Sequence, residues 1–205
     1  MIEKDTYKTI AKPSKEVLFK DKNSKFLGYA FPVKNEEEIK AHIETLKKKH
    51  HAARHWCYAY QLGTHEPFTF RANDDGEPNN SAGMPIYGQI QSFEVTNVLI
   101  VVVRYFGGVK LGVGGLINAY RTASQMALDA SKIVTKVVAK TILVTFEYAN
   151  INKVMRIIKE KNLTVVNQKL ELDCEITISV RLRDIPSILE TFGTQYGIET
   201  KVLND

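Results

Sequence analysis

The sequence predicts a mixed α+β protein with two domains, an α/β domain over residues 1–136 and a ferredoxin-like βαββαβ domain over residues 137–205. Two patterns support this prediction. Apolar and polar residues alternate strictly from Glu171 to Leu182, which is typical of a strand with one buried and one solvent-facing side. Upstream, the apolar run from Asn97 to Tyr105 leads into five glycines and then a helical pattern, as in a strand–loop–helix unit.

Composition places the chain among globular proteins. Its 205 residues are 44% hydrophobic and 25% charged, which is enough apolar material for one large or two small cores. No apolar run approaches the ~20 residues of a membrane helix, and the N-terminus lacks a signal-peptide core, so we expect a cytoplasmic protein without membrane contact. Cys57 and Cys174 are too few for a disulfide framework or a four-cysteine zinc site, and we expect both to be reduced.

The positive charge is confined to the first domain. Residues 1–136 contain 19 lysines and arginines against 14 acidic residues, a net charge of +5, whereas residues 137–205 contain nine of each. Such an excess can attract a phosphate-rich partner electrostatically, although lysine-rich surfaces also serve solubility alone.

The first domain is expected to alternate strands and helices. Asn35 followed by Glu38 forms a capping-box-like start to a helix, whose apolar stripe is Ile39, Ile43 and Leu46. The other expected elements are two or three strands over residues 6–33, a strand over 55–61, a loop over 63–84, a short helix over 85–93, a strand over 97–105 and a helix ending near 131. A loop of about twenty residues is uncommon in a compact domain and is typical of functional or disordered segments.

The second domain is expected to have the order βαββαβ. Asn150 is predicted to cap a helix with the stripe Ile151, Met155 and Ile158, and Asp184 to cap the next helix. The expected strands cover residues 138–148, 163–170, 171–182 and 198–203. The exposed row of the alternating strand is acidic and hydroxylic and holds no aromatic residue, so base stacking on this strand is not expected.

The glycine loop is the first candidate site. Its glycines are Gly107, Gly108, Gly112, Gly114 and Gly115. The loop lacks the Lys-Ser/Thr ending of a P-loop, and Ile117 stands where a dinucleotide fingerprint needs its third glycine. Backbone N–H groups at a helix start, with Arg104 and Lys110 nearby, suit an anion. The alternative is that the glycines permit only tight turns and close helix packing.

The acidic run is the second candidate site. Asp74, Asp75 and Glu77 could hold Mg²⁺ or act as acid and base in a small hydrolase, or they could be turn formers, and their spacing excludes an EF-hand. His50, His51, His55 and Cys57 suggest a zinc site or a Cys–His nucleophile, but two ligands on one strand do not make either. A cleft shared by Arg54, His55 and the acidic loop is the stronger prediction.

Three linked motifs can be recognised between residues 15 and 130. They are Arg54-His55-x-Cys57-x-Ala59-Tyr60; Asn73-Asp74-Asp75-Gly76-Glu77-Pro78 with Ala82-Gly83-x-Pro85; and Val101-Val102-Val103-Arg104-Tyr105-Phe106-Gly107-Gly108-x-x-Leu111-Gly112-x-Gly114-Gly115-Leu116 with Ala119-Tyr120. Together they resemble the IMPACT/YigZ family, and the trailing βαββαβ unit resembles the C-terminal domain of its bacterial YigZ-like members. One departure is visible, because Asn80 stands where the family usually has glycine.

The resemblance implies a fold and a cellular context. The first domain should have the left-handed-crossover fold shared by a small-subunit ribosomal protein and the fourth domain of elongation factor G, and the second should look like the last domain of that factor. Eukaryotic members regulate translation initiation under amino-acid stress by competing for an activator of an initiation-factor kinase. For bacterial members, contact with nucleic acid or the ribosome rests on analogy of fold.

The leading hypothesis is therefore a cytoplasmic, non-enzymatic regulator of translation that binds RNA or the ribosome, without a cofactor. Its expected contacts to phosphate are Arg54, His55, Arg104, Lys110 and the five loop glycines. The alternatives are a small hydrolase that uses Asp74, Asp75 and Glu77, with or without Mg²⁺, and a protein-interaction module that binds a translation-related protein.

Overall fold

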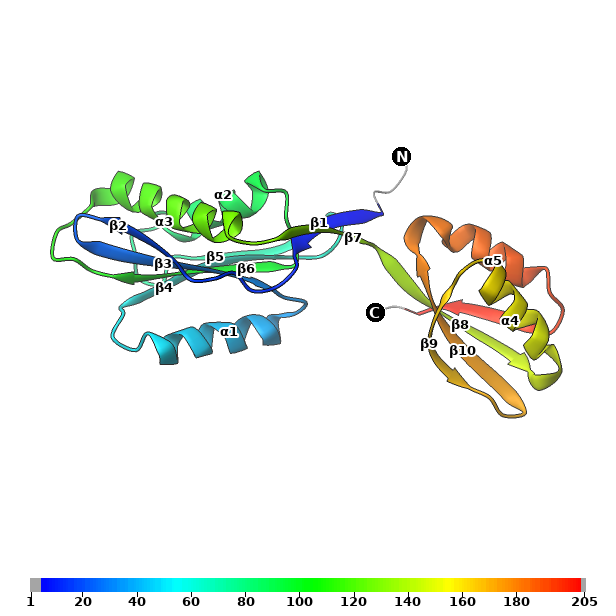
Figure 1. Cartoon of the computed structure of the whole chain (residues 1–205). Coiled ribbons are helices and arrows are strands. Elements are labelled where there is room, and N and C mark those ends of the chain that lie inside the picture. Colours follow the sequence, from blue (N-terminus) through cyan, green and yellow to red (C-terminus); the bar gives the residue numbers. More distant parts are fainter. Residues whose placement is uncertain (1–4, 204–205) are drawn as a thin grey trace. The chain divides into compact units, whose positions relative to one another are not determined.

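The chain forms two compact units in a computed structural model that describes residues 5–203 (Figure 1). One unit is Tyr7–Lys136, and the other runs from Val137 onward and includes Asp5 and Thr6. The sequence boundary placed these two N-terminal residues in the first domain. They group with the second because Val138 N donates to Asp5 O at 2.8 Å and Arg181 Nε donates to the Asp5 carboxylate at 2.5 Å. Within residues 5–203, none of the helices combines the length and apolar character that crossing a bilayer requires.

The first unit is built on a five-stranded sheet in the order β2-β3-β6-β4-β5, with antiparallel neighbours throughout. Helix α1 lies on one face of this sheet, and α2 and α3 lie on the other (Figure 1). Strand β1 pairs separately with β7. The elements are β1 (Thr6–Ile10), β2 (Val17–Asp21), β3 (Ser24–Pro32), α1 (Glu36–Lys49), β4 (His55–Leu62), β5 (Thr69–Asn73), α2 (Gly83–Ser92), β6 (Val98–Tyr105), α3 (Gly112–Asp129) and β7 (Ile133–Val137).

Strand β6 is central and buried on both faces, which explains why its sequence is a continuous apolar run. The residues facing α2 and α3 are Val98, Ile100 and Val102, and those facing α1 are Leu99, Val101 and Val103. Helix α1 begins as predicted, because Asn35 Oδ1 accepts a hydrogen bond from Glu38 N at 2.9 Å. Its predicted stripe, Ile39, Ile43 and Leu46, is buried.

The predicted loop over residues 63–84 is partly wrong, since it contains strand β5, which pairs with β4. Three of the five β5 residues are exposed, so this edge strand has no apolar alternation that could mark it in the sequence.

The second unit has the predicted βαββαβ order, with the antiparallel strand order β11-β8-β10-β9. Apolar residues of α4 and α5 and the buried row of β10 share one core. The elements are β8 (Ala139–Glu147), α4 (Ile151–Glu160), β9 (Thr164–Lys169), β10 (Asp173–Arg181), α5 (Ile185–Gly193) and β11 (Ile198–Val202), with single 3₁₀ turns at Tyr148–Asn150 and Leu182–Asp184. A mixed α+β fold in two parts is thus confirmed, whereas the likeness to elongation-factor domains stays a prediction.

Details of the second unit depart from the sequence analysis. Neither Asn150 nor Asp184 caps its helix through the side chain, because each closes a 3₁₀ turn with backbone angles far from the extended conformation that capping needs. Val154 and Ile157 are buried on α4, whereas the predicted stripe residue Met155 is 42% exposed. Leu172 precedes β10 and is 87% exposed, so the alternation begins at Asp173.

A hydrogen-bond network fixes the end of α1 against the sheet. His50 caps the helix; its Nε2 lies 2.6 Å from the Tyr29 hydroxyl and its Nδ1 lies 3.0 Å from the Tyr105 hydroxyl. Tyr29 donates in turn to Glu16 at 2.5 Å, and Lys49 Nζ donates to the same carboxylate at 2.9 Å. Both ring nitrogens of His50 therefore have protein partners, which leaves neither for a metal.

The burial of His50 predicts a pH-dependent stability. Burial and the nearby Lys49 lower its pKa, and Glu16 opposes them. As pH falls below about 6.5, the unfolded chain binds a proton that the folded ring resists, so the free energy of unfolding should decrease. Denaturant unfolding between pH 7.5 and 5.5 should show this decrease, and His50→Gln should reduce it. The exposed His51→Gln is the control, and an unchanged slope in His50→Gln would contradict the assignment.

Candidate functional site

The acidic turn and the strand that leads into the glycine loop meet through a buried ion pair. Arg104, next to last in β6, donates from Nη1 to Glu77 Oε1 at 2.6 Å. The two side chains are only 7% and 4% exposed. Two segments that are 27 residues apart are thereby tied together at one end of the sheet.

Neutral groups surround this pair. The Tyr120 hydroxyl, from α3, donates to the same Glu77 oxygen at 2.7 Å, and Cys57 Sγ lies 3.3 Å from that hydroxyl. Burial raises the pKa of both Tyr120 and Cys57, so the phenol and the thiol stay protonated. Arg104 also lies against the rings of Phe26 and Phe106, at 5.4 and 5.5 Å. A protonated, buried Cys57 is unsuited to act as a nucleophile.

The carboxylates of the acidic run are all engaged inside the domain. Asp75 and Gly76 have positive φ angles of 44° and 86°, and Glu77 N donates to Asp74 O at 3.0 Å, which closes a tight turn. The Asp74 carboxylate accepts from the backbone N–H groups of Asn80, Ala82 and Gly83 at 2.8–2.9 Å.

These hydrogen bonds give each acidic residue a structural role. Asp74 caps the start of α2, and Asp75 Oδ2 accepts from Trp56 N at 2.7 Å. Within residues 5–203, no group of three His, Cys, Asp or Glu side chains is arranged to hold a metal ion. The three carboxylates of the hydrolase alternative are thus each held by different groups of the domain.

Asn80 adopts the backbone conformation that its family position implies. Its φ is +59°, in the left-handed region where glycine is favoured and asparagine is the best-tolerated substitute. The departure from the family pattern is thus compatible with the fold.

The turn-and-packing interpretation of the glycine loop applies to some of its glycines but not to all. A Cβ on Gly107 would lie 2.1 Å from the carbonyl carbon of Asn23, so Gly107 is required for close packing on the β2–β3 turn. Gly108 and Gly112 have φ angles of +86° and +75°, which favour glycine. Gly114 is different, because it has an ordinary helical φ and a Cβ at this position would have no neighbouring group within 4 Å.

The start of α3 carries no negative side chain. Its N-cap residue, Leu111, offers no side-chain hydrogen bond, and its first turn contains no acidic residue. The first N–H groups of a helix have no intrahelical acceptor and carry the positive end of its dipole. Lys110 is exposed and directly precedes Leu111, the N-cap residue of this helix.

The predicted site residues divide into two sets. Arg104 is buried and paired, which argues against direct contact with phosphate, and half-buried His55 is held by Asp75 O at 2.9 Å from its Nδ1. Arg54 and Lys110 are exposed. Because His55 pairs with Arg104 in register, Arg54, which immediately precedes β4, lies at the sheet end where β6 enters the glycine loop.

Sequence reasoning missed a pocket on the opposite, α1 face. It has a volume of about 210 Å³ and lies between α1 and the β4–β5 side of the sheet. Trp56, Tyr58 and Tyr60 alternate along β4, and this period could have indicated that their rings share the α1 face.

The buried pair predicts a large loss of stability on removing one charge. Glu77→Gln leaves the Arg104 charge uncompensated in the interior and should lower the free energy of unfolding by about 3 kcal/mol. Glu44→Gln is the matched control, because Glu44 forms an exposed pair with Lys47 and should change it by less than about 0.5 kcal/mol. Urea unfolding of both variants measures the difference, and equal midpoints would contradict a structural role for the pair.

Comparison with known proteins agrees with the motifs. The Impact N-terminal domain matches residues 22–128, just over half of the chain. The chain is 34% identical over 137 residues to the IMPACT family member YvyE of Bacillus subtilis, covering 67% of this chain and 63% of that protein. It is 37% identical over 108 residues to YigZ of Escherichia coli, covering 52% and 53%. The chain thus spans less than two thirds of either relative.

A solved structure supports the architecture. The crystal structure of a hypothetical protein superposes with a TM-score of 0.74, covering 98% of this chain and 99% of that one at 23% identity, which bears on the fold alone. The domain match and the bacterial relatives confirm the resemblance drawn from the three motifs: the chain belongs to the IMPACT family.

Proposed function

We propose that this IMPACT-family protein binds RNA or the ribosome and regulates translation through binding rather than catalysis. The observation that carries this proposal is the uncapped, carboxylate-free start of α3 in an exposed glycine loop. The backbone N–H groups there can donate to phosphate oxygens, as helix starts commonly do.

Gly114 strengthens the argument. Glycine in the first turn of a helix costs conformational entropy, and neither steric crowding nor a positive φ requires glycine here. A missing side chain at this point leaves the helix start open to close approach by a ligand.

The surrounding charges favour a polyanion. Lys110 and Arg54 are exposed, and the net charge of +5 over residues 1–136 would steer a phosphate-bearing partner toward this unit. Arg104 supports the site from inside, since its guanidinium lies against the ring of Phe106 at the loop entrance.

The translational role rests on family membership, because the resemblance implies regulation of translation initiation for eukaryotic members. A partner protein in place of RNA is the competing outcome. It would be indicated by capture of a translation-related protein that survives nuclease treatment while RNA binding is absent.

Gly114→Asp tests the proposed phosphate contact with opposite effects on stability and binding. An acidic side chain in the first turn of a helix is stabilising, so the melting temperature should rise by about 1–4 °C. The same charge should repel phosphate and weaken binding to ribosomes or to single-stranded RNA by at least about tenfold.

Gly114→Ala is the matched control, because it adds a side chain without charge.

In a salt series, Lys110→Ala should reduce the slope of log affinity against log salt by about 0.7 for single-stranded RNA. Binding that is absent at low salt, or that Gly114→Asp leaves unchanged, would refute the proposal.

A further inference from the structure

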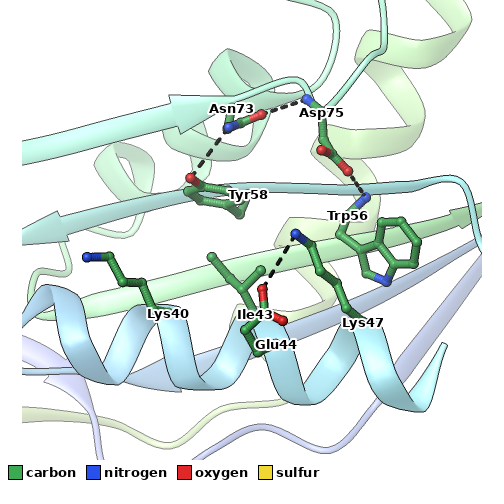
Figure 2. A pocket seen from close by; sticks show the side chains of 8 residues that line it. All are labelled: Lys40, Ile43, Glu44, Lys47, Trp56, Tyr58, Asn73 and Asp75. Carbon is green, nitrogen blue, oxygen red and sulfur yellow. Dashed lines mark hydrogen bonds and ion pairs between the residues drawn. The ribbon is translucent and has the colours of Figure 1, made fainter. Parts of the chain in front are cut away.

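The pocket on the α1 face is lined by chemistry that the glycine loop does not use. Figure 2 shows the side chains of α1 facing those of β4 across the pocket, with the end of β5 above. Lys40, Ile43, Glu44 and Lys47 follow a helical i, i+3, i+4, i+7 spacing and therefore share one side of α1. Trp56 and Tyr58, two residues apart on β4, present aromatic rings on the same face.

Two residues of this lining each have a polar side-chain atom without a hydrogen-bond partner among residues 5–203. The Asp75 carboxylate is fixed through Oδ2 by Trp56 N, and its Oδ1 accepts no hydrogen bond from any described residue. The indole Nε1 of Trp56 is buried and likewise lacks an acceptor within residues 5–203. Unpaired buried donors are rare and call for a bound partner or water.

The charges of the pocket are mixed. Lys40 makes no ion pair with the described residues, and Lys47 lies 3.6 Å from Glu44 in an exposed pair that is easily redirected. The two lysines are offset by Glu44 and Asp75, so the lining favours neither a purely acidic nor a purely basic peptide. It suits a flat ligand with an N–H donor at one end and a negative charge at the other.

We propose that this pocket binds one unpaired nucleotide of a single-stranded RNA segment, and this rests on the RNA binding proposed above. The base stacks on the aromatic side of β4, its exocyclic amino group donates to Asp75 Oδ1, and its phosphate contacts Lys40 and Lys47. Aromatic stacking with flanking lysines is the common means of holding unpaired bases. The carboxylate selects cytosine over uracil, because uracil presents a carbonyl oxygen where cytosine has its amino group.

Trp56 reports directly on the pocket, since it is the only tryptophan of the chain. Titration of the full chain with short cytidine and uridine oligoribonucleotides should quench its fluorescence, with the cytidine oligomer binding at least about fivefold more tightly. Asp75→Asn keeps an acceptor for Trp56 N and replaces the free oxygen with an amide donor, so the preference should reverse toward uridine.

The lysines are tested with a matched pair of variants. Lys40→Ala combined with Lys47→Ala should weaken binding by about tenfold and flatten the salt dependence by about 1.4. Lys48→Ala, exposed on α1 outside the pocket lining, should change neither. Circular dichroism melting of each variant confirms that the fold is retained.

The outcomes separate this inference from the proposed function. One outcome overturns the pocket alone. In it, Gly114→Asp weakens RNA binding, but RNA does not change the Trp56 fluorescence and the double lysine variant binds RNA as tightly as the unmodified chain. Equal affinity for the two oligomers that Asp75→Asn does not alter also overturns it. Absence of any RNA binding overturns both proposals together.

Discussion

The buried ion pair between Arg104 and Glu77 organises the first unit. It joins the end of the central strand to the acidic turn, and Tyr120 adds the longest helix of that unit to the same carboxylate. An ion pair inside a core is seldom a source of net stability, because both charges lose their hydration. What the pair does here is fix the position of the acidic turn against the end of β6.

The turn that carries Glu77 is hydrogen-bonded both to the backbone of strand β4 and to the start of α2. Asp75 holds Trp56, whose ring lies on the α1 face, while Asp74 holds the start of α2 on the other. Most residues in the segments that resemble the family motifs therefore hold strands and helices of the domain in position. The exposed remainder is the glycine loop with Arg54 and Lys110, the surface for which we propose phosphate contact.

Sequence patterns were sufficient where local rules decide the structure. The Asn35 cap, the stripe of α1 and the buried row of β10 follow from spacing alone. The sequence patterns failed where contacts between residues far apart in the chain decide the structure. Arg104 follows an apolar run and looks like a surface cation, and its burial depends on an acid 27 residues away. Strand β5 forms by pairing with β4, which the local sequence of β5 does not reveal. The pocket lies between α1 and the β4–β5 side of the sheet, so it too depends on how distant segments pack.

The two helices on the same face of the first sheet differ in one respect with a wider meaning. At the amino end of α2, the backbone N–H groups of Ala82 and Gly83 donate to the carboxylate of Asp74, which also accepts from Asn80 N in the preceding loop. At the amino end of α3, the N-cap residue Leu111 makes no such side-chain hydrogen bond, and the first turn holds no carboxylate among the described residues. The Asp74 carboxylate therefore takes the place that an anionic ligand would have at a helix start. The N–H groups that donate to it show, within the same molecule, how an oxyanion is bound there.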